Sequence, residues 1–304
     1  MACVAFDLDE TIGNFQAIGI LANLWSVDDL NTPEQLQGNP FTPSRDLKTK
    51  LERVKETFAN YILRDKNLLD MIIRPNIGEL FEPLLAAKRS KHLKTMIIYS
   101  NTGNKFSVEL AERLLEQMFG PNLFSVKADW WHPLRRADKV VVQGEVITHK
   151  RIETLQLLFQ KALKTKKSIP LGNILFIDDR SPRHTLIQQV PQGLSYLVPT
   201  AFHPTIPVKQ KDHLLFMAFA AMEQHGLFEN PEYLQSKFCN RTIHVSYPPM
   251  PPVKIKGVIE LFRAVGTLFM DVEGAPWQPD SAALRKGVKE YLQNVRSSSV
   301  CCTV

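Results

Sequence analysis

Two pairs of acidic residues each follow a short apolar run, and they are the first candidates for chemistry in this sequence. Asp7 and Asp9 end the run A-C-V-A-F-D-L-D, and Asp178 with Asp179 follows N-I-L-F-I. Carboxylate oxygens are hard ligands that Mg²⁺ accepts, together with water and phosphate. One carboxylate can attack phosphorus, while a second protonates the leaving oxygen and later activates water. The alternative is a pair of ordinary polar strand ends, because D-x-D is a frequent pattern.

Ser100 follows another apolar run, T-M-I-I-Y, and opens the segment S-N-T-G. Its hydroxyl group and the backbone N–H groups of Asn101 and Thr102 are donors that suit phosphoryl oxygens. The alternative role for Ser100 is the N-cap of the helix that follows.

Lys150 lies at the start of a predicted amphipathic helix, where its ammonium group would neutralise a transferring phosphate. Taken alone it would be a solvated helix lysine. Lys127 and Lys139 are rivals for the same role. We prefer Lys150 because its helix leads into the strand that ends in Asp178.

These residues need a scaffold that brings strand ends together. Apolar runs predict buried strands at 2–8, 95–99, 173–177 and 195–198, with helical patterns between them. Strands that alternate with helices favour a parallel sheet covered on both faces, the α/β class with a Rossmann-like three-layer architecture. The site of such a sheet lies outside the carboxyl ends of its strands.

In order and kind, D-L-D-E-T at residues 7–11, Ser100 after a strand, an isolated Lys150, and I-D-D at residues 177–179 resemble the four motifs of the haloacid dehalogenase superfamily. The resemblance covers roughly residues 1–205. Within the superfamily, D-L-D-E-T followed by F-I-D-D-R-S-P is most similar to the phosphatases that act on the C-terminal domain of RNA polymerase. The stretch R-P-N-I-G-E-L-F, from Arg74 to Phe81, also resembles a segment of that group.

The resemblance implies a Mg²⁺-dependent phosphomonoester hydrolase that works through an aspartyl-phosphate. Asp7 would be the nucleophile and Asp9 the general acid and base, while Lys150 would stabilise the charge of nucleophile and phosphate. The implied phosphate-side residues are Thr11, which also supports the turn after the strand, Ser100 and Asn101. The implied metal ligands are Asp7, Asp9, Asp178 and Asp179.

The patterns divide the chain into a haloacid dehalogenase-like catalytic domain, residues 1–207, and a helical C-terminal extension, residues 208–304. A helical insertion at about 14–72 lies where cap domains occur in family members that act on small metabolites, and a proline-rich linker spans 247–254. A cap that closes over the site would exclude large substrates. A phosphoprotein and a small phosphometabolite therefore both stay open as substrates.

The composition is that of a soluble globular protein, with 44% hydrophobic and 22% charged residues in 304. No apolar run reaches the roughly 20 residues that a membrane-spanning helix needs, and the N-terminal residues lack the basic region of a secretory signal. Four scattered cysteines predict neither disulfides nor a zinc site, which favours a cytoplasmic or nuclear location. The ending Cys301-Cys302-Thr303-Val304 has the outline of a lipidation signal, but valine is an unusual final residue, and we expect a frayed tail.

The net charge of +6 fits an anionic substrate or partner, although the basic residues form short clusters typical of a solvated surface. The run W-W-H-P-L-R-R at residues 130–136 predicts either recognition of an anionic substrate or a packed flap with buried aromatic rings. Two other functions compete with the phosphatase. One is a catalytically silent scaffold that binds a protein partner through its C-terminal extension. The other is a polynucleotide end-phosphatase, for which a long basic groove is missing.

Overall fold

The computed structural model describes residues 1–22, 24–25, 42–142, 145–180, 191–202, 208–238, 242–243, 253–254 and 281–300. The sequence also predicts a turn at residues 143–144 and a helix near 258–269. These two segments, most of the proline-rich linker and the tail at Cys301 and Cys302 lie outside the described residues. No described helix is long and apolar enough to cross a membrane.

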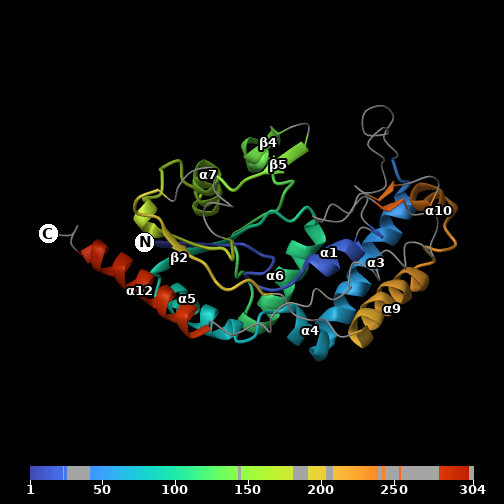
Figure 1. The fold of residues 1–304 in the computed structure, drawn as a ribbon, viewed down its shortest axis with the longest axis horizontal. Coiled ribbons are helices and arrows are strands. Elements are labelled where there is room, and N and C mark those ends of the chain that lie inside the picture. Colours follow the sequence, from blue (N-terminus) through green and yellow to red (C-terminus); the bar gives the residue numbers. More distant parts are fainter. Residues whose placement is uncertain are drawn as a thin grey trace. The chain divides into compact units, whose positions relative to one another are not determined.

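Strands and helices alternate along most of the chain, as the sequence pattern predicts (Figure 1). The strands are β1 (Ala2–Phe6), β2 (Leu93–Tyr99), β3 (Val126–Ala128), β4 (Lys139–Val142), β5 (Glu145–Thr148), β6 (Ile174–Ile177), β7 (Ser195–Leu197), β8 (Thr242–Ile243) and β9 (Val253–Lys254). The α-helices are α1 (Gln16–Ala22), α3 (Arg45–Arg64), α4 (Lys66–Ile72), α5 (Ile77–Arg89), α6 (Lys105–Phe119), α7 (Ile152–Leu163), α9 (Val208–Gln224), α10 (Pro231–Phe238) and α12 (Ser281–Val300). Two short 3₁₀ turns are η2 (Pro133–Asp138) and η3 (Leu171–Asn173).

A five-stranded sheet in the order β3-β2-β1-β6-β7 forms the centre of the fold, and every pair in it is parallel. The α/β class predicted from the sequence is therefore confirmed. Four of the described helices, α1, α3, α4 and α5, lie between β1 and β2 in the chain. Parallel strands need helical crossovers, which cover the sheet and explain why β1 is apolar and buried along its whole length.

The two faces of β1 pack against different helices. Ala5 belongs to a buried cluster with Leu158 and Phe159 of α7. Phe6 points to the opposite face, where its ring stacks on Phe81 of α5 with centroids 5.2 Å apart. Helices α7 and α5 accordingly lie on opposite sides of the strands (Figure 1). This two-sided burial is the source of the three-layer arrangement.

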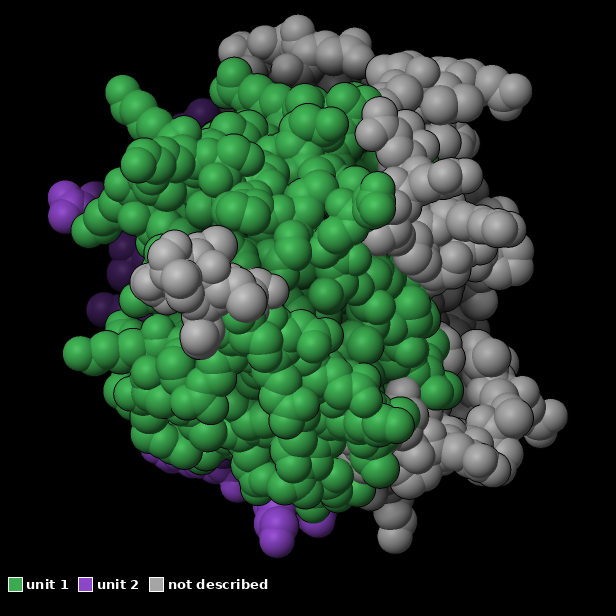
Figure 2. Space-filling view, turned by 90° about the vertical axis from the view of Figure 1, so that its left-hand side faces the viewer, with its two compact units in different colours: residues 1–15, 70–204, 275–304 green, residues 16–69, 205–274 purple. Residues whose placement is uncertain are grey.

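Contacts between residues group the chain into two compact units, coloured separately in Figure 2. Unit 1 contains the parallel sheet and comprises residues 1–15, 70–204 and 275–304. Unit 2 comprises residues 16–69 and 205–274; in it, α3 packs along α9, and the hydroxyl of Tyr233 donates a hydrogen bond of 2.7 Å to the Leu24 carbonyl oxygen. The domain boundaries predicted from the sequence stay predictions.

Helix α12, near the end of the chain, packs on α5 within unit 1. Its Tyr291 hydroxyl donates to the carbonyl oxygen of Asn173 at 2.5 Å and accepts from the backbone N–H of Cys3 at 3.3 Å. A Cβ atom added to Gly287 would lie 2.7 Å from the Leu197 side chain, so α12 also approaches β7 closely. The helix therefore contacts α5, the start of β1 and the edge strand β7.

Three details differ from the sequence expectations. A proline within a helical pattern predicts a kink or a restart at Pro83, but α5 continues through it from Ile77 to Arg89. The run V-K-A-D-W-W predicts a strand that includes Trp130 and Trp131, whereas β3 ends at Ala128 and the tryptophans follow it in a turn. Helix α10 was not anticipated, because its eight residues are too few to show a clear periodicity.

Cys3 is the one cysteine within the described residues, and it is unbonded and buried in β1. Burial raises the pKa of its thiol to about 11, although the nearby N-terminal charge acts in the opposite direction. A thiol that stays protonated is a poor nucleophile and a poor metal ligand. We therefore assign Cys3 a structural role, as a small side chain packed in the hydrophobic core.

Replacing Tyr291 by Phe should lower the free energy of unfolding by about 1–2 kcal/mol, because buried backbone groups lose a hydrogen-bond partner. Urea denaturation followed by circular dichroism measures the change. Lys289→Ala, on the exposed side of the same helix, is the matched control and should change stability by less than about 0.5 kcal/mol. Equal stability of wild type and Tyr291→Phe would contradict a role for this hydroxyl in anchoring α12.

Candidate active site at the carboxyl edge of the sheet

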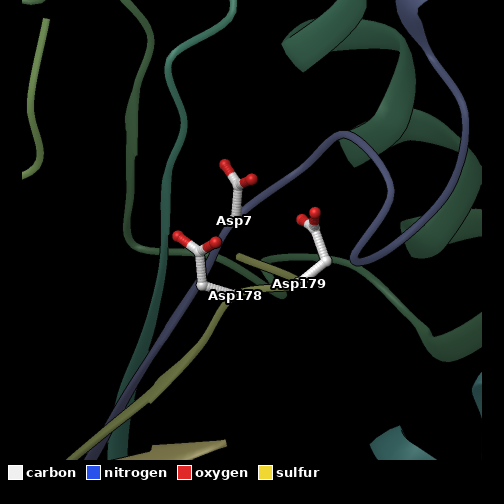
Figure 3. A group of neighbouring side chains, drawn as sticks. All are labelled: Asp7, Asp178 and Asp179. Atoms are coloured by element: carbon white, nitrogen blue, oxygen red, sulfur yellow. The ribbon is translucent and has the colours of Figure 1, made fainter. Parts of the chain in front are cut away.

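The register of the sheet brings the predicted catalytic residues to one edge. Phe6 of β1 lies opposite Ile98 of β2 and Ile177 of β6. The residues that follow these three positions therefore leave the sheet at the same end, among them Asp7 and the pair Asp178–Asp179. Figure 3 shows the carboxyl groups of these three aspartates pointing to the same side.

Lys150 makes the central contacts of the site. Its Nζ atom lies 2.6 Å from Asp7 Oδ1 and 2.6 Å from Asp178 Oδ2, and 1% of the lysine side chain is exposed. Burial acts to lower the pKa of Lys150, but the charges of Asp178 and Asp7 outweigh it and raise that pKa above its ordinary value. The ammonium group is therefore held in its charged form between the two motifs.

Exposure distinguishes the two carboxylates that Lys150 contacts. The side chain of Asp178 is fully buried, whereas 10% of the Asp7 side chain is exposed. A substrate arriving from solvent can reach Asp7 but not Asp178. The exposure of Asp7 suits the nucleophile that the sequence predicts there, whereas the sequence predicts Asp178 as a metal ligand.

The three aspartates also fit a divalent cation. One carboxylate oxygen from each of Asp7, Asp178 and Asp179 lies within 4.8 Å of the others. Burial is the main cause that raises the pKa of Asp178 and the pKa of Asp179 to about 6. The charge of Asp7 raises both pKa values further, and for Asp178 the charge of Lys150 opposes the increase. The single ammonium group of Lys150 does not neutralise the negative charge of three neighbouring carboxylates. Their oxygen atoms form a donor set that suits Mg²⁺.

Asp9 is not part of this three-member cluster, and its role as a metal ligand stays a prediction. Its Oδ1 accepts a hydrogen bond of 3.1 Å from the backbone N–H of Phe15. Burial and, secondarily, the charge of Asp7 raise the pKa of Asp9 to about 7. A carboxyl group with that pKa exchanges protons readily near neutrality, which suits a general acid and base.

A tight loop after β1 sets the direction of the Asp9 side chain. Glu10 adopts a left-handed conformation with φ of 64°, and its N–H donates to the Gly13 carbonyl oxygen at 2.7 Å. A Cβ atom at Gly13 would lie 2.3 Å from the Ile72 carbonyl oxygen, so a side chain does not fit there. The left-handed conformation of Glu10 and its hydrogen bond to Gly13 therefore fold the loop back on itself.

Arg74 holds this loop in place through hydrogen bonds to its backbone. Its guanidinium group, 3% exposed as a residue, donates to the carbonyl oxygens of Thr11 at 2.7 Å, Glu10 at 2.6 Å and Thr200 at 2.6 Å. Its planar fork of donors can satisfy several carbonyl groups at once. The R-P segment noted in the sequence thus supports the loop that carries Asp9.

Thr11 links the first acidic motif to the last. Its hydroxyl donates to Asp179 Oδ1 at 2.8 Å and accepts from the Asp179 backbone N–H at 2.8 Å. The residue is 1% exposed, and these two hydrogen bonds join two loops of the protein. Its contact with phosphate stays a prediction.

Ser100 is not the N-cap of the following helix. That position belongs to Asn104, whose side chain accepts from the N–H groups of Phe106 and Ser107. The Ser100 Oγ accepts instead from the N–H of Thr102 at 3.2 Å, which fixes the loop at the end of β2. The competing explanation for Ser100 is thereby removed, while phosphate binding by Ser100 and Asn101 stays a prediction.

A buried network joins this loop to the segment that carries Lys150. Arg135, which is fully buried, donates to Asp138 Oδ2 at 2.9 Å, to the Ser100 carbonyl oxygen, and to Asn101 Oδ1 at 2.5 Å. Asp138 also accepts from the Tyr99 hydroxyl at 2.8 Å and from the Thr154 hydroxyl at 2.5 Å. Strand β2, turn η2 and helix α7 are thus connected through one carboxylate.

Comparison with protein-family models and with curated proteins finds no match for this chain. The case for a function therefore depends on the motifs and on the geometry that they adopt.

The rival lysines have other contacts. Lys127 pairs with Glu112 on the surface, and Lys139 lies over the rings of Trp130 and Trp131. Of the three candidates, Lys150 is the one with an ion pair to Asp7.

Sequence reasoning missed the role of Arg135. The run at residues 130–136 contains two adjacent arginines of identical chemistry, yet Arg135 is fully buried and Arg136 is exposed. The expectation of buried aromatic rings is wrong for Trp131, which is 62% exposed. A possible signal was the i, i+3 spacing of Arg135 and Asp138, but it is too common to carry weight.

Replacing Arg135 by Met should destabilise the protein by about 3–5 kcal/mol, because the buried carboxylate of Asp138 would lose its cation. Arg136→Met, one residue further along and exposed, is the matched control, with an expected change under about 0.5 kcal/mol. Urea unfolding of both variants makes the comparison. Similar stabilities of the two variants would show that the network is dispensable.

Proposed function

We propose that this chain is a Mg²⁺-dependent phosphomonoester hydrolase of the haloacid dehalogenase type. The observation that carries the proposal is the position of the buried Lys150 ammonium group, 2.6 Å from both Asp7 and Asp178 at the carboxyl edge of the sheet. Residues from three distant parts of the sequence meet there, and they are the residues to which the motif order assigns the nucleophile, the lysine and a metal ligand. The parallel sheet and its register support the same assignment.

The reaction would begin with attack of an Asp7 carboxylate oxygen on phosphorus, forming a P–O bond as the ester P–O bond breaks. Asp9 would give its proton to the departing oxygen, which leaves as an alcohol. Asp9 would then take a proton from water, whose oxygen attacks phosphorus and releases phosphate and the free Asp7 carboxylate.

The rest of the site would supply charge and orientation. Lys150 would offset the negative charge that gathers on Asp7 and phosphate, and the Ser100–Asn101 loop would orient the phosphoryl oxygens. Mg²⁺ held by Asp7, Asp178 and Asp179 would supply a positive charge that draws phosphate to the nucleophile. Positioning and charge neutralisation account for most of phosphoryl-transfer catalysis, which matches the residues available.

Phosphate release from phenyl phosphate should require Mg²⁺ and should be abolished, with a loss of at least roughly 1,000-fold, in Asp7→Asn, because the amide is not a nucleophile of comparable strength. Malachite-green detection of phosphate, with and without EDTA, measures this. Asp212→Asn, an exposed aspartate of α9, is the matched control and should retain wild-type turnover.

Full activity in Asp7→Asn would rule out Asp7 as the nucleophile. Complete absence of turnover in a folded wild-type protein, over a panel of aryl, alkyl and peptide phosphates, would favour the second function, a catalytically silent scaffold.

Asp178→Asn should raise the Mg²⁺ concentration needed for half-maximal activity by roughly 10- to 100-fold, since the cation would lose a charged partner. A Mg²⁺ titration of turnover tests this, and Mg²⁺-dependent protection against thermal unfolding provides a second readout. An unchanged Mg²⁺ requirement in both measurements would place the metal elsewhere.

A further inference from the structure

Trp131 is a large aromatic residue that the proposed chemistry leaves unexplained. It is 62% exposed, although tryptophan is highly buried on average. Its indole N–H donates to the Gly103 carbonyl oxygen at 2.8 Å, and its backbone N–H donates to Asp129 Oδ1 at 3.0 Å. The ring is therefore held in one orientation while most of its surface faces solvent.

A cation accompanies this ring. The Nζ atom of Lys139 lies 4.7 Å from the centroid of the Trp131 ring and 5.4 Å from that of Trp130. Such cation–π contacts are favourable and fix the ammonium group beside the indole. The pair combines an exposed flat surface with a positive charge, which is the combination that binds nucleic-acid bases and their phosphates.

The ring lies at the same sheet edge as the candidate active site. Trp130 donates its N–H to the Thr102 carbonyl oxygen at 2.9 Å, and Trp131 donates to the neighbouring Gly103, so both are hydrogen-bonded to the loop that begins at Ser100. Strand β3, which ends just before them, is the second neighbour of β1. Two strand spacings place the end of β3 about 10 Å from the strand that ends at Asp7.

We propose that the substrate is a nucleotide whose base stacks on Trp131 while its phosphate is held beside Asp7, an inference that depends on the proposed phosphatase function. The segments that carry Trp131 and Asp7 start from strand ends about 10 Å apart, which favours a ligand longer than an aryl phosphate. In an aryl phosphate the ring is joined directly to the ester oxygen and lies too near the phosphorus. In a nucleoside monophosphate the sugar stands between the two groups and provides the reach.

The experiment is calorimetric titration of the full chain carrying Asp7→Asn, in Mg²⁺, with three probes: adenosine 5′-monophosphate, ribose 5-phosphate and phenyl phosphate. The first two differ by the base alone. We expect adenosine monophosphate to bind at least about 10-fold more tightly than ribose 5-phosphate, the size that stacking on an aromatic side chain supplies.

Adding Trp131→Ala should remove that preference, so that both ligands bind alike, whereas Trp131→Phe should keep most of it. Phe216→Ala is the matched control, because Phe216 is an aromatic residue of α9 with 70% exposure. Equal affinities for adenosine monophosphate and ribose 5-phosphate would overturn the inference. So would a preference that survives Trp131→Ala, or tightest binding of phenyl phosphate.

The outcomes also separate this inference from the proposed function. Wild-type turnover of phenyl phosphate without a Trp131-dependent preference for the base would leave the phosphatase standing and remove the nucleotide. Trp131-dependent binding of adenosine monophosphate without any turnover would contradict the phosphatase proposal. It would leave a surface that binds the base beside a catalytically silent site.

Discussion

The geometry of the candidate site depends on one buried cation. A lysine ammonium group with 1% exposure would be costly without partners, because its lost hydration is worth several kcal/mol. Lys150 has two carboxylate partners at 2.6 Å, one after β1 and one after β6. The same contact lets two carboxylates approach each other in a poorly solvated place. Without the cation, the negative charges of Asp7 and Asp178 would repel each other with no partner between them.

The position of Lys150 depends in turn on a second buried charge. Asp138 accepts from the hydroxyl of Tyr99 at the end of β2 and from Thr154 in the first turn of α7. The Tyr99 hydroxyl also accepts from the backbone N–H of Arg151, immediately after Lys150, at 2.7 Å. One network therefore sets both the loop after β2 and the segment that delivers the lysine. Their relative position is fixed before any substrate binds, which is the condition for electrostatic stabilisation of a transition state.

Much of this arrangement could be predicted because it follows from strong local patterns. Apolar runs that end in acids identified β1 and β6, and a parallel arrangement places Asp7 and Asp178 at the same edge of the sheet. That the two residues meet follows from the pairing of β1 with β6, which the sequence does not give. The network around Asp138 could not be predicted, because nothing in the sequence distinguishes the buried Arg135 from the exposed Arg136. Their difference arises from the path of η2 across the end of β2, and such three-dimensional placement has no periodic signature. The exposure of Trp131 could not be predicted for the same reason, so the sequence left open whether its run recognises a substrate or packs as a flap.

The insertion after the first strand leaves the site intact because its two ends meet. Gly13 forms a bridge with Ile73, and the N–H of Asn14 donates to the Ile72 carbonyl oxygen at 2.7 Å, so the chain leaves and re-enters unit 1 at adjacent points. Insertions of that kind are tolerated, because the host fold needs no adjustment to accommodate them. The close approach also explains the glycine, whose missing Cβ leaves room for the Ile72 carbonyl group. Arg74 comes directly after Ile73 and binds the loop that carries Asp9. The segment where the chain returns from the insertion therefore also supports the site.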